Sequence, residues 1–135
     1  MAREPLKLEV VTADRVIWEG DAVNVIARTV EGDIGILPGH SPLLAALVPS
    51  VVEIVTADGL TEVVAVEDGF LSVSQGHVWI LTPAGAIASE ISLDAVFKEA
   101  APLRQLREAG DISDEQKRRL LILEAQIRVA ERAKK

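Results

Sequence analysis

The chain contains no cysteine, few aromatic residues and no long uninterrupted apolar segment. Without cysteine, the 135-residue chain forms neither disulfides nor thiolate metal sites. Its two histidines, His40 and His77, lie 37 residues apart in different segments, so we expect no metal site. Aromatic residues make up only 3% of the sequence, so its core must be built from Val, Ile, Leu and Ala. Its apolar runs fall short of the roughly 20 residues that a membrane-spanning helix requires.

Acidic residues dominate the first part of the chain. Residues 1–88 hold 4 Lys or Arg and 12 Asp or Glu, whereas residues 89–135 hold 10 and 9. The net charge of −7 disfavours nucleic acid as a partner, because affinity for nucleic acid depends mostly on phosphate neutralisation. The last nineteen residues, from Lys117, carry 7 basic and 2 acidic side chains. This surplus suits either an electrostatic contact or the negative end of a helix dipole.

Short strands separated by turn signals are predicted over residues 1–88. Leu6, Leu8 and Val10 recur at the period of two that is typical of a strand half buried in a sheet. Further strands are predicted between glycine-containing dipeptides, at residues 15–19, 22–29, 51–57, 61–66, 70–74 and 77–82. Several strands are apolar on both faces, which indicates burial on more than one side. This pattern predicts an all-β sandwich.

Helix-forming residues replace β-branched ones from Ser92 onward. Ser92 is predicted to cap a first helix, which Pro102 should kink or break and which Gly110 should end. A second helix is predicted after the capping box that begins at Ser113, and it should run toward Lys134. Residues 89–135 are therefore predicted to form a C-terminal α-helical hairpin after the N-terminal β-domain of residues 1–88.

The second predicted helix has one apolar stripe at helical spacing, made by Leu120, Leu123, Ile127 and Ala130. Two helices of this length cannot bury such a stripe fully by themselves. The hairpin must rest on the sandwich, rest on another chain, or alternate between the two. We take this incompleteness as the first indication of function.

The segment EGDIGILPGHSP, residues 31–42, concentrates glycine, proline and polar side chains. Asp33, His40 and Ser41 could compose a hydrolytic triad, but adjacent His and Ser side chains point different ways in an extended chain. The glycines match neither dinucleotide-binding nor P-loop spacing, and no lysine follows them. We interpret the segment as a loop with Asp33 and His40 exposed and with three residues in the core: Ile34, Ile36 and Leu37. An enzyme is the least favoured class.

The longer segment EGDIGILPGHSPLLAAL, residues 31–47, resembles the signature of the epsilon subunit of F-type ATP synthases. The resemblance continues at residues 8–14, 18–20, 68–71 and 125–131, so it covers most of the chain. It implies a ten-stranded β-sandwich followed by a helical hairpin, in a non-catalytic rotor subunit of the central stalk. The length and the lack of a transit segment fit a bacterial member, held peripherally at the cytoplasmic face of the cell membrane.

The resemblance also implies partners. The sandwich should bind the gamma subunit and stand on the ring of c subunits, with Glu31, Asp33 and His40 facing the polar loops of that ring. In many family members the hairpin extends along gamma into the catalytic head and blocks ATP hydrolysis. We expect basic residues of the last helix to assist this inhibition by contacting the alpha and beta subunits: Lys117, Arg118, Arg119, Arg128 and Arg132.

Some family members bind regulatory ATP at the hairpin base through an [IL]-D-x-x-R-A motif. Residues 93–98 of this chain, LDAVFK, stand in its place, with Phe97 where the arginine belongs. Ile122 and Gln126 stand where ATP-binding members place further arginines. We expect weak or absent ATP binding, because lysine lacks the guanidinium fork that matches phosphate. Asp94 agrees with the motif, and Lys98 and Arg104 are the nearby residues that could partly compensate for the missing arginine.

Two alternatives stay open in the sequence. A free-standing sandwich adaptor with a helical arm explains the same pattern, and co-purification with gamma and c subunits distinguishes it from a stalk subunit. Trp18 and Trp79 suit either the edge of the core or a protein interface, where tryptophan is enriched.

Overall fold

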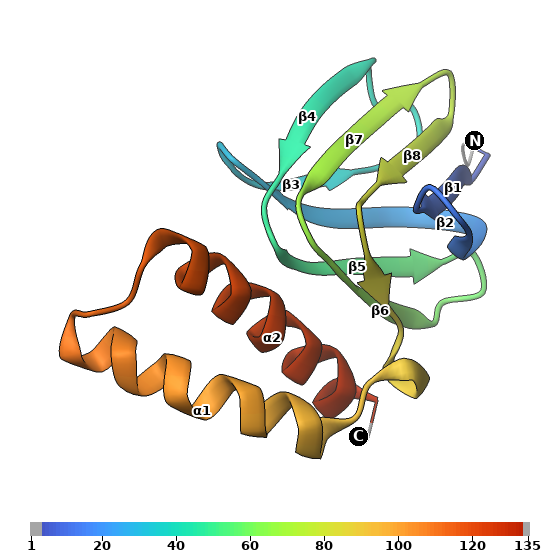
Figure 1. The fold of residues 1–135 in the computed structure, drawn as a ribbon. Helices are drawn as coiled ribbons and strands as arrows, with labels where there is room; N and C mark the ends of the chain where they lie inside the picture. The colour runs from blue at the N-terminus through green and yellow to red at the C-terminus, as the bar shows by residue number, and fades with distance from the viewer. Residues whose placement is uncertain (1–3, 134–135) are drawn as a thin grey trace.

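A computed structural model of the chain describes residues 4–133 (Figure 1). Within this range the strands come first and the helices follow. The strands are β1 (Leu6–Val11), β2 (Val16–Thr29), β3 (Gly32–Ile36), β4 (Leu43–Leu47), β5 (Ser50–Thr56), β6 (Thr61–Val66), β7 (Gly69–Ser74), β8 (His77–Leu81) and β9 (Gly85–Ala86). The helices are the short 3-10 helix η1 (Ala88–Glu90), α1 (Leu93–Ala109) and α2 (Asp114–Arg132).

The strands form a β-sandwich whose two layers share the long strand β2. One layer has the order β1-β8-β7-β4, and the other contains β3, β2, β5, β6 and β9. β1 pairs with β8 in parallel, and the other pairs are antiparallel. The buried core between the layers is aliphatic, as the scarcity of aromatic residues predicted. Its largest fully buried members are Leu6, Leu8, Ile36, Ile54, Leu71 and Ile80.

The period of two predicted for β1 is confirmed, because Leu6, Leu8 and Val10 are all buried. The predicted turn at Gln75-Gly76 is also confirmed. Both residues have positive φ, 50° for Gln75 and 79° for Gly76. Such a pair of left-handed residues matches the twist of a two-residue hairpin, here between β7 and β8.

The prediction of ten strands is wrong for the described residues 4–133, which contain nine. The strands predicted at 15–19 and 22–29 form one strand, because Gly20 and Asp21 pair with β1 instead of turning. The pairing of β2 with β5 shifts register between Ala22 and Asn24. Such a bulge bends a strand, and here it accompanies the passage of β2 from one layer to the other.

The predicted caps at Ser92 and Ser113 and the predicted end at Gly110 are confirmed, whereas Lys134, toward which the second helix was predicted to run, lies outside the described residues. The Ser92 hydroxyl accepts a hydrogen bond from the backbone N–H of Ala95 at 3.4 Å, and α1 ends at Gly110 with φ of 76°. At the start of α2, the Ser113 hydroxyl accepts from the backbone N–H of Gln116 at 3.1 Å. The Gln116 side chain accepts from the N–H of Ser113 at 2.9 Å, which completes the capping box.

The predicted break at Pro102 is wrong, because α1 continues through it. Proline removes one hydrogen bond, to the carbonyl four residues earlier. Ala100 and Leu103, on either side of Pro102, pack against α2 and keep the turn helical. In Figure 1, α2 lies between the strands and α1, so the hairpin rests on the sandwich through α2.

Candidate functional site

The two helices form a hairpin with an apolar core of its own. Within residues 4–133, three ion pairs join the helices. Arg119 Nη2 lies 2.8 Å from Glu99 Oε1, and Glu124 pairs with both Arg107 at 3.1 Å and Arg104 at 3.4 Å. The hydrogen bonds from Arg119 lower the pKa of Glu99 below its usual value of 4.5. Aliphatic packing and these pairs make the hairpin a coherent unit. Its buried side chains include Val96, Ala100, Leu120, Leu123 and Ile127.

Small side chains contribute to the apolar contact between the hairpin and the sandwich, as does the buried Ile122 of α2, which lines a small cavity with Ala65 and Val66 of β6. Ala125 and Val129 of α2 pack on Ala65 of β6, and all three are buried. Val51 of β5 and Val63 of β6 lie beside them. Burial of a valine side chain contributes about 1.5–3 kcal/mol and burial of an alanine contributes less. The apolar contact between hairpin and sandwich therefore consists of a few aliphatic side chains, fewer than the hairpin buries in its own core.

Ion pairs fasten the two ends of α2 to the sandwich. Near the start of α2, Arg118 Nη2 lies 2.8 Å from Asp68 Oδ1 and 3.5 Å from Glu67 Oε1. At the end of α2, Arg132 donates a hydrogen bond to Glu53 of β5. We call Arg118–Asp68 and Arg132–Glu53 the docking ion pairs. Their side chains are substantially exposed, and exposed pairs of this kind contribute about 0.2–1 kcal/mol each.

The structure separates the five basic residues predicted for α2 into different environments. Arg118 and Arg132 pair with the sandwich, whereas Arg119 pairs with α1. Lys117 and Arg128 are exposed, and neither forms an ion pair with another residue in the range 4–133. In this arrangement, therefore, three of the five cations hold the hairpin together or hold it on the sandwich.

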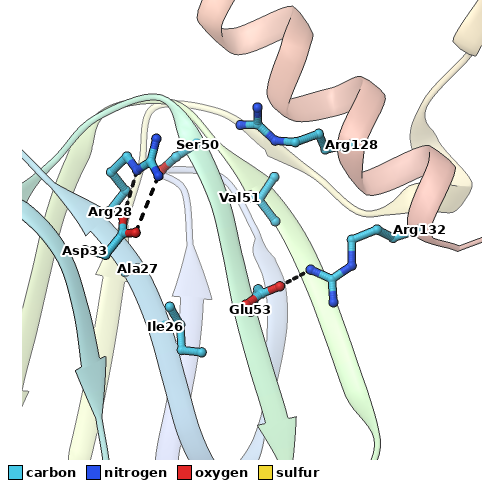
Figure 2. Close-up of a pocket in the computed structure, with 9 residues that line it drawn as sticks. All are labelled: Ile26, Ala27, Arg28, Asp33, Ser50, Val51, Glu53, Arg128 and Arg132. Atoms are coloured by element: carbon cyan, nitrogen blue, oxygen red, sulfur yellow. Dashed lines mark hydrogen bonds and ion pairs between the residues drawn. The ribbon is translucent and has the colours of Figure 1, made fainter.

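A cavity of about 320 Å³ lies between α2 and the outer face of β2 and β5 (Figure 2). Ile26 and Val51 supply apolar lining. Arg28 of β2 donates hydrogen bonds to Asp33 of β3 from Nε at 2.8 Å and from Nη2 at 3.4 Å. These bonds lower the pKa of Asp33 below its usual value of 3.8. Arg128 reaches over the cavity from α2.

The interpretation of residues 31–42 as a loop is wrong over Gly32–Ile36, which form β3. This strand pairs with β2 from Thr29–Gly32 to Val25–Ile36. A loop was expected because of the glycines, but antiparallel pairing accommodates Gly35 as an ordinary strand residue. Ile36 is fully buried and Ile34 half-buried, as predicted. Leu37 is 57% exposed, contrary to its predicted place in the core, because it lies beyond the last paired residue.

The structure does not bring together the three residues predicted to face the c ring. Glu31 is exposed in the two-residue turn between β2 and β3, and Asp33 lies next to it, paired with Arg28. His40 follows the opposite end of β3, and the strand from Gly32 to Ile36 spans about 13 Å at the usual rise per residue. It is half-buried, contrary to its predicted exposure, and its Nδ1 lies 2.7 Å from the Ser41 carbonyl oxygen.

The positions considered for nucleotide binding are dispersed on α1. Asp94 and Lys98 are exposed, whereas Arg104 is half-buried and pairs with Glu124 at 3.4 Å. Ile122 and Gln126, where ATP-binding relatives are expected to carry arginines, line a cavity of only about 50 Å³. Pockets for organic ligands usually span roughly 300–1,000 Å³, so this space does not accommodate a nucleotide in the docked arrangement.

Sequence reasoning missed the sandwich residues that receive the hairpin. No recognisable motif contains Glu53, Asp68 or Ala65, because the role of these residues depends on where α2 lies. One available signal was the pair of strand segments that are apolar on both faces. Val52 and Val64 face the sandwich core, while their neighbours face α2. The second apolar face of these strands was therefore the signal that could have indicated the docking surface.

Two kinds of feature are absent from residues 4–133. We find no group of three or more His, Cys, Asp or Glu side chains placed to hold a metal ion. Across that range, neither helix combines the length and the apolar character needed to span a membrane.

Comparisons with known proteins agree on one family. The sequence model described as "ATP synthase, Delta/Epsilon chain, beta-sandwich domain" matches residues 5–87. An ATP synthase epsilon chain of Cutibacterium acnes is 45% identical over 106 residues, which are 78% of this chain and 73% of the relative. The ATP synthase epsilon chain of Rhodococcus jostii is 39% identical over 129 residues, 95% of this chain and 98% of the relative.

A solved structure has the same fold. It is a chain from the mitochondrial ATP synthase of Euglena gracilis, in an assembly described as OSCP/F1/c-ring. The TM-score is 0.79 at 23% identity, over 96% of this chain and 83% of that chain. From the family match and the sequence relatives we conclude that this chain belongs to the ATP synthase epsilon chain family.

Proposed function

We propose that this epsilon chain is a stalk subunit whose sandwich couples the gamma subunit to the c ring and whose hairpin regulates ATP hydrolysis. As a member of this family the chain is a non-catalytic subunit of ATP synthase. Residues 1–88 are proposed to serve coupling, and residues 89–135 to serve regulation. Its proposed place is the cytoplasmic face of the bacterial cell membrane, reached through the assembled complex. Family membership argues against a free-standing adaptor.

One observation carries the regulatory part of this proposal. The hairpin has its own aliphatic core, while it meets the sandwich through Ala65, Ala125 and Val129 and the exposed docking ion pairs. Loss of the contact with the sandwich leaves the aliphatic core of the hairpin intact. The hairpin therefore exchanges the sandwich for another partner surface at small net cost, as a two-state element requires. We propose that the released hairpin contacts the alpha and beta subunits with Lys117, Arg118, Arg119, Arg128 and Arg132.

Removal of the hairpin tests this regulation. A chain truncated after Glu90 keeps every strand of the sandwich. Assembled into the synthase, it should support ATP synthesis and raise the rate of ATP hydrolysis above that of the complete chain. Equal hydrolysis rates with both chains, measured with and without membrane energisation, would contradict the regulatory role.

The outer face of the layer β1-β8-β7-β4 is the proposed contact with gamma. Phe70 of β7 and Leu81 of β8 are register partners and are 54% and 52% exposed. Trp79, on the same face of β8, is 38% exposed and donates a hydrogen bond to Glu9 at 3.1 Å. Leu44 of β4 extends the patch. Two of the four aromatic residues of the chain thus lie on one exposed surface, and aromatic side chains are enriched at protein interfaces.

Substitution of Trp79 by alanine tests the gamma contact. Loss of one central aromatic residue typically costs about 2 kcal/mol of binding, or roughly a 30-fold weaker affinity. Leu60→Ala is the control, because Leu60 is an exposed apolar residue, 60% exposed, that lies outside this face, in the turn between β5 and β6. A folded Trp79→Ala chain that binds gamma as tightly as the Leu60→Ala chain would exclude this face.

Contact with the c ring is proposed for Glu31, Asp33 and His40. Because Glu31 and His40 lie at opposite ends of β3, single substitutions distinguish their contributions. Glu31→Gln or Asp33→Asn should loosen coupling between proton flow and ATP synthesis if the β2–β3 turn faces the ring. Loss of coupling only in His40→Ala would assign the contact to the other end of β3. Full coupling in all three folded variants would exclude the ring contact.

We propose that ATP binds weakly or not at all at the hairpin base. The dispersed positions of Asp94, Lys98 and Arg104 and the 50 Å³ cavity beside Ile122 and Gln126 support this proposal. Calorimetric titration of the isolated chain with ATP should give no micromolar binding that depends on Lys98 or Arg104. A micromolar dissociation constant that is lost in Lys98→Gln or Arg104→Gln would overturn it.

A further inference from the structure

Three arginines from two elements surround the cavity beside α2. Arg28 extends from β2, and Arg128 and Arg132 extend from α2 toward the strands (Figure 2). Among residues 4–133, two carboxylates line the same cavity, those of Asp33 and Glu53. The lining therefore has one more positive than negative charge, in the part of the molecule where the acidic sandwich meets the basic end of the chain.

The carboxylates leave much of the hydrogen-bonding capacity of these arginines unused. A guanidinium group has five N–H donors. Arg28 uses Nε and Nη2 on Asp33, which leaves Nη1. Arg132 uses Nη1 on Glu53, which leaves Nε and Nη2. Arg128 forms no hydrogen bond or ion pair with another side chain among residues 4–133.

We propose that this cavity binds an oxyanion of the phosphate class, with Arg128 as its main ligand. A phosphate group presents several acceptor oxygens and more than one negative charge, and planar guanidinium forks match that geometry. A carboxylate has only two oxygens and one charge, so it satisfies fewer of these donors. The volume of about 320 Å³ lies within the range of ligand pockets and exceeds the space that one phosphate group needs.

A bound oxyanion joins the sandwich to the hairpin. Arg28 belongs to β2, whereas Arg128 and Arg132 belong to α2. Binding therefore stabilises the docked arrangement over any arrangement in which α2 has left the strands. This regulatory consequence rests on the proposed release of the hairpin, but the binding site itself does not.

Titration of the isolated complete chain tests the site directly. The probes are inorganic phosphate, pyrophosphate and ADP, each added at constant ionic strength against chloride. Nuclear magnetic resonance of the arginine side-chain Nε–H groups reports the position of binding. We expect saturable shifts of Arg128, Arg28 and Arg132, with pyrophosphate binding more tightly than phosphate. Affinity for ADP equal to that for pyrophosphate means that the site recognises phosphate groups alone. Tighter ADP binding means that the apolar lining also contacts the nucleoside.

Matched variants make this test decisive. Arg128→Gln removes an exposed side chain without a described ion pair, so the chain should keep its melting temperature. Its affinity for pyrophosphate should fall about tenfold, the effect of losing one charge-assisted interaction. Arg107→Gln is the control, because it removes the same charge from the far side of the hairpin and leaves Glu124 paired with Arg104. Its affinity should change less than about twofold.

Three results would overturn the proposed site. They are no saturation with any probe, equal loss of affinity in Arg107→Gln and Arg128→Gln, and shifts centred on Arg104. None of these measurements uses the assembled synthase. Phosphate binding without any effect on hydrolysis would therefore leave the site standing and count only against the proposed regulation.

Discussion

Removal of the carboxylates from the docking ion pairs should release the hairpin and strengthen inhibition. The double substitution Glu53→Gln and Asp68→Asn changes only the sandwich. It removes the partners of Arg132 and Arg118 while leaving every residue of the hairpin in place. The released hairpin therefore keeps the cations that we propose for contact with the alpha and beta subunits.

The size of this effect follows from the exposure of the pairs. Exposed ion pairs contribute about 0.2–1 kcal/mol each. Arg118 keeps Glu67 as a partner at 3.5 Å, so the loss at that end is incomplete. A combined loss of about 1 kcal/mol shifts the equilibrium between docked and released hairpins roughly fivefold. Raised salt concentration should have a similar effect on the unsubstituted chain, because it screens exposed charges.

Hydrolysis by the assembled synthase and the spectrum of the isolated chain provide the readouts. The synthase assembled with the double variant should hydrolyse ATP more slowly than the synthase with the unsubstituted chain. The synthase assembled with the chain truncated after Glu90 should hydrolyse ATP faster. In the isolated chain, the methyl resonances of Ala65 and Ala125 should shift toward the released state, since both methyl groups are buried in the docking contact.

The opposite signs make the result interpretable. If the synthase with the double variant hydrolyses ATP as fast as the synthase with the truncated chain, the docked hairpin is the inhibitory form. Unchanged hydrolysis together with shifted methyl resonances would mean that release does not inhibit. The control is Asp14→Asn with Glu19→Gln, which removes two exposed carboxylates of the sandwich that form no ion pair with the hairpin. It should match the unsubstituted chain.

Three further predictions concern stability. Gly69→Ala should lower the free energy of unfolding, measured by chemical denaturation, by more than about 3 kcal/mol, because φ is 138° and a Cβ would lie 1.9 Å from a carbonyl oxygen of β8. Gly59→Ala is the control: φ is 88° but the space around it is open, so the loss should be only about 1 kcal/mol. Pro102→Ala should raise stability by about 2 kcal/mol, because it restores a helical hydrogen bond on an exposed face, and an unchanged or lowered denaturation midpoint would contradict this. Arg119 depresses the folded-state pKa of Glu99 below 4.5, so the unfolded chain takes up this proton first. The stabilisation from this pair is complete above pH 4.5 and is lost as the pH falls through the folded pKa, so denaturation midpoints of Glu99→Gln should decline less steeply over that window.

Local signals in the sequence predicted most of the secondary structure. The alternation at Leu6, Leu8 and Val10 and the caps at Ser92 and Ser113 depend on neighbours within a few residues, and each was found where it was expected. The failures were also physical. A glycine in β2 and a proline in α1 are unfavourable in isolation, but pairing with β1 and packing on α2 outweigh those preferences.

Sequence separation explains which parts of the candidate site could be predicted. Arg28 and Asp33 are five residues apart across a two-residue turn, so recognising a hairpin at Val30-Glu31 would have paired them. Glu53 and Arg132 are 79 residues apart, and their contact depends on how α2 settles on β5 and β6. The family motif specifies no such register. The motif therefore identified the family, whereas the docking ion pairs and the arginine-lined cavity could be found only from the docked position of α2. Because both depend on the docked position of α2, the docking ion pairs and the cavity should be lost together whenever the hairpin leaves the sandwich.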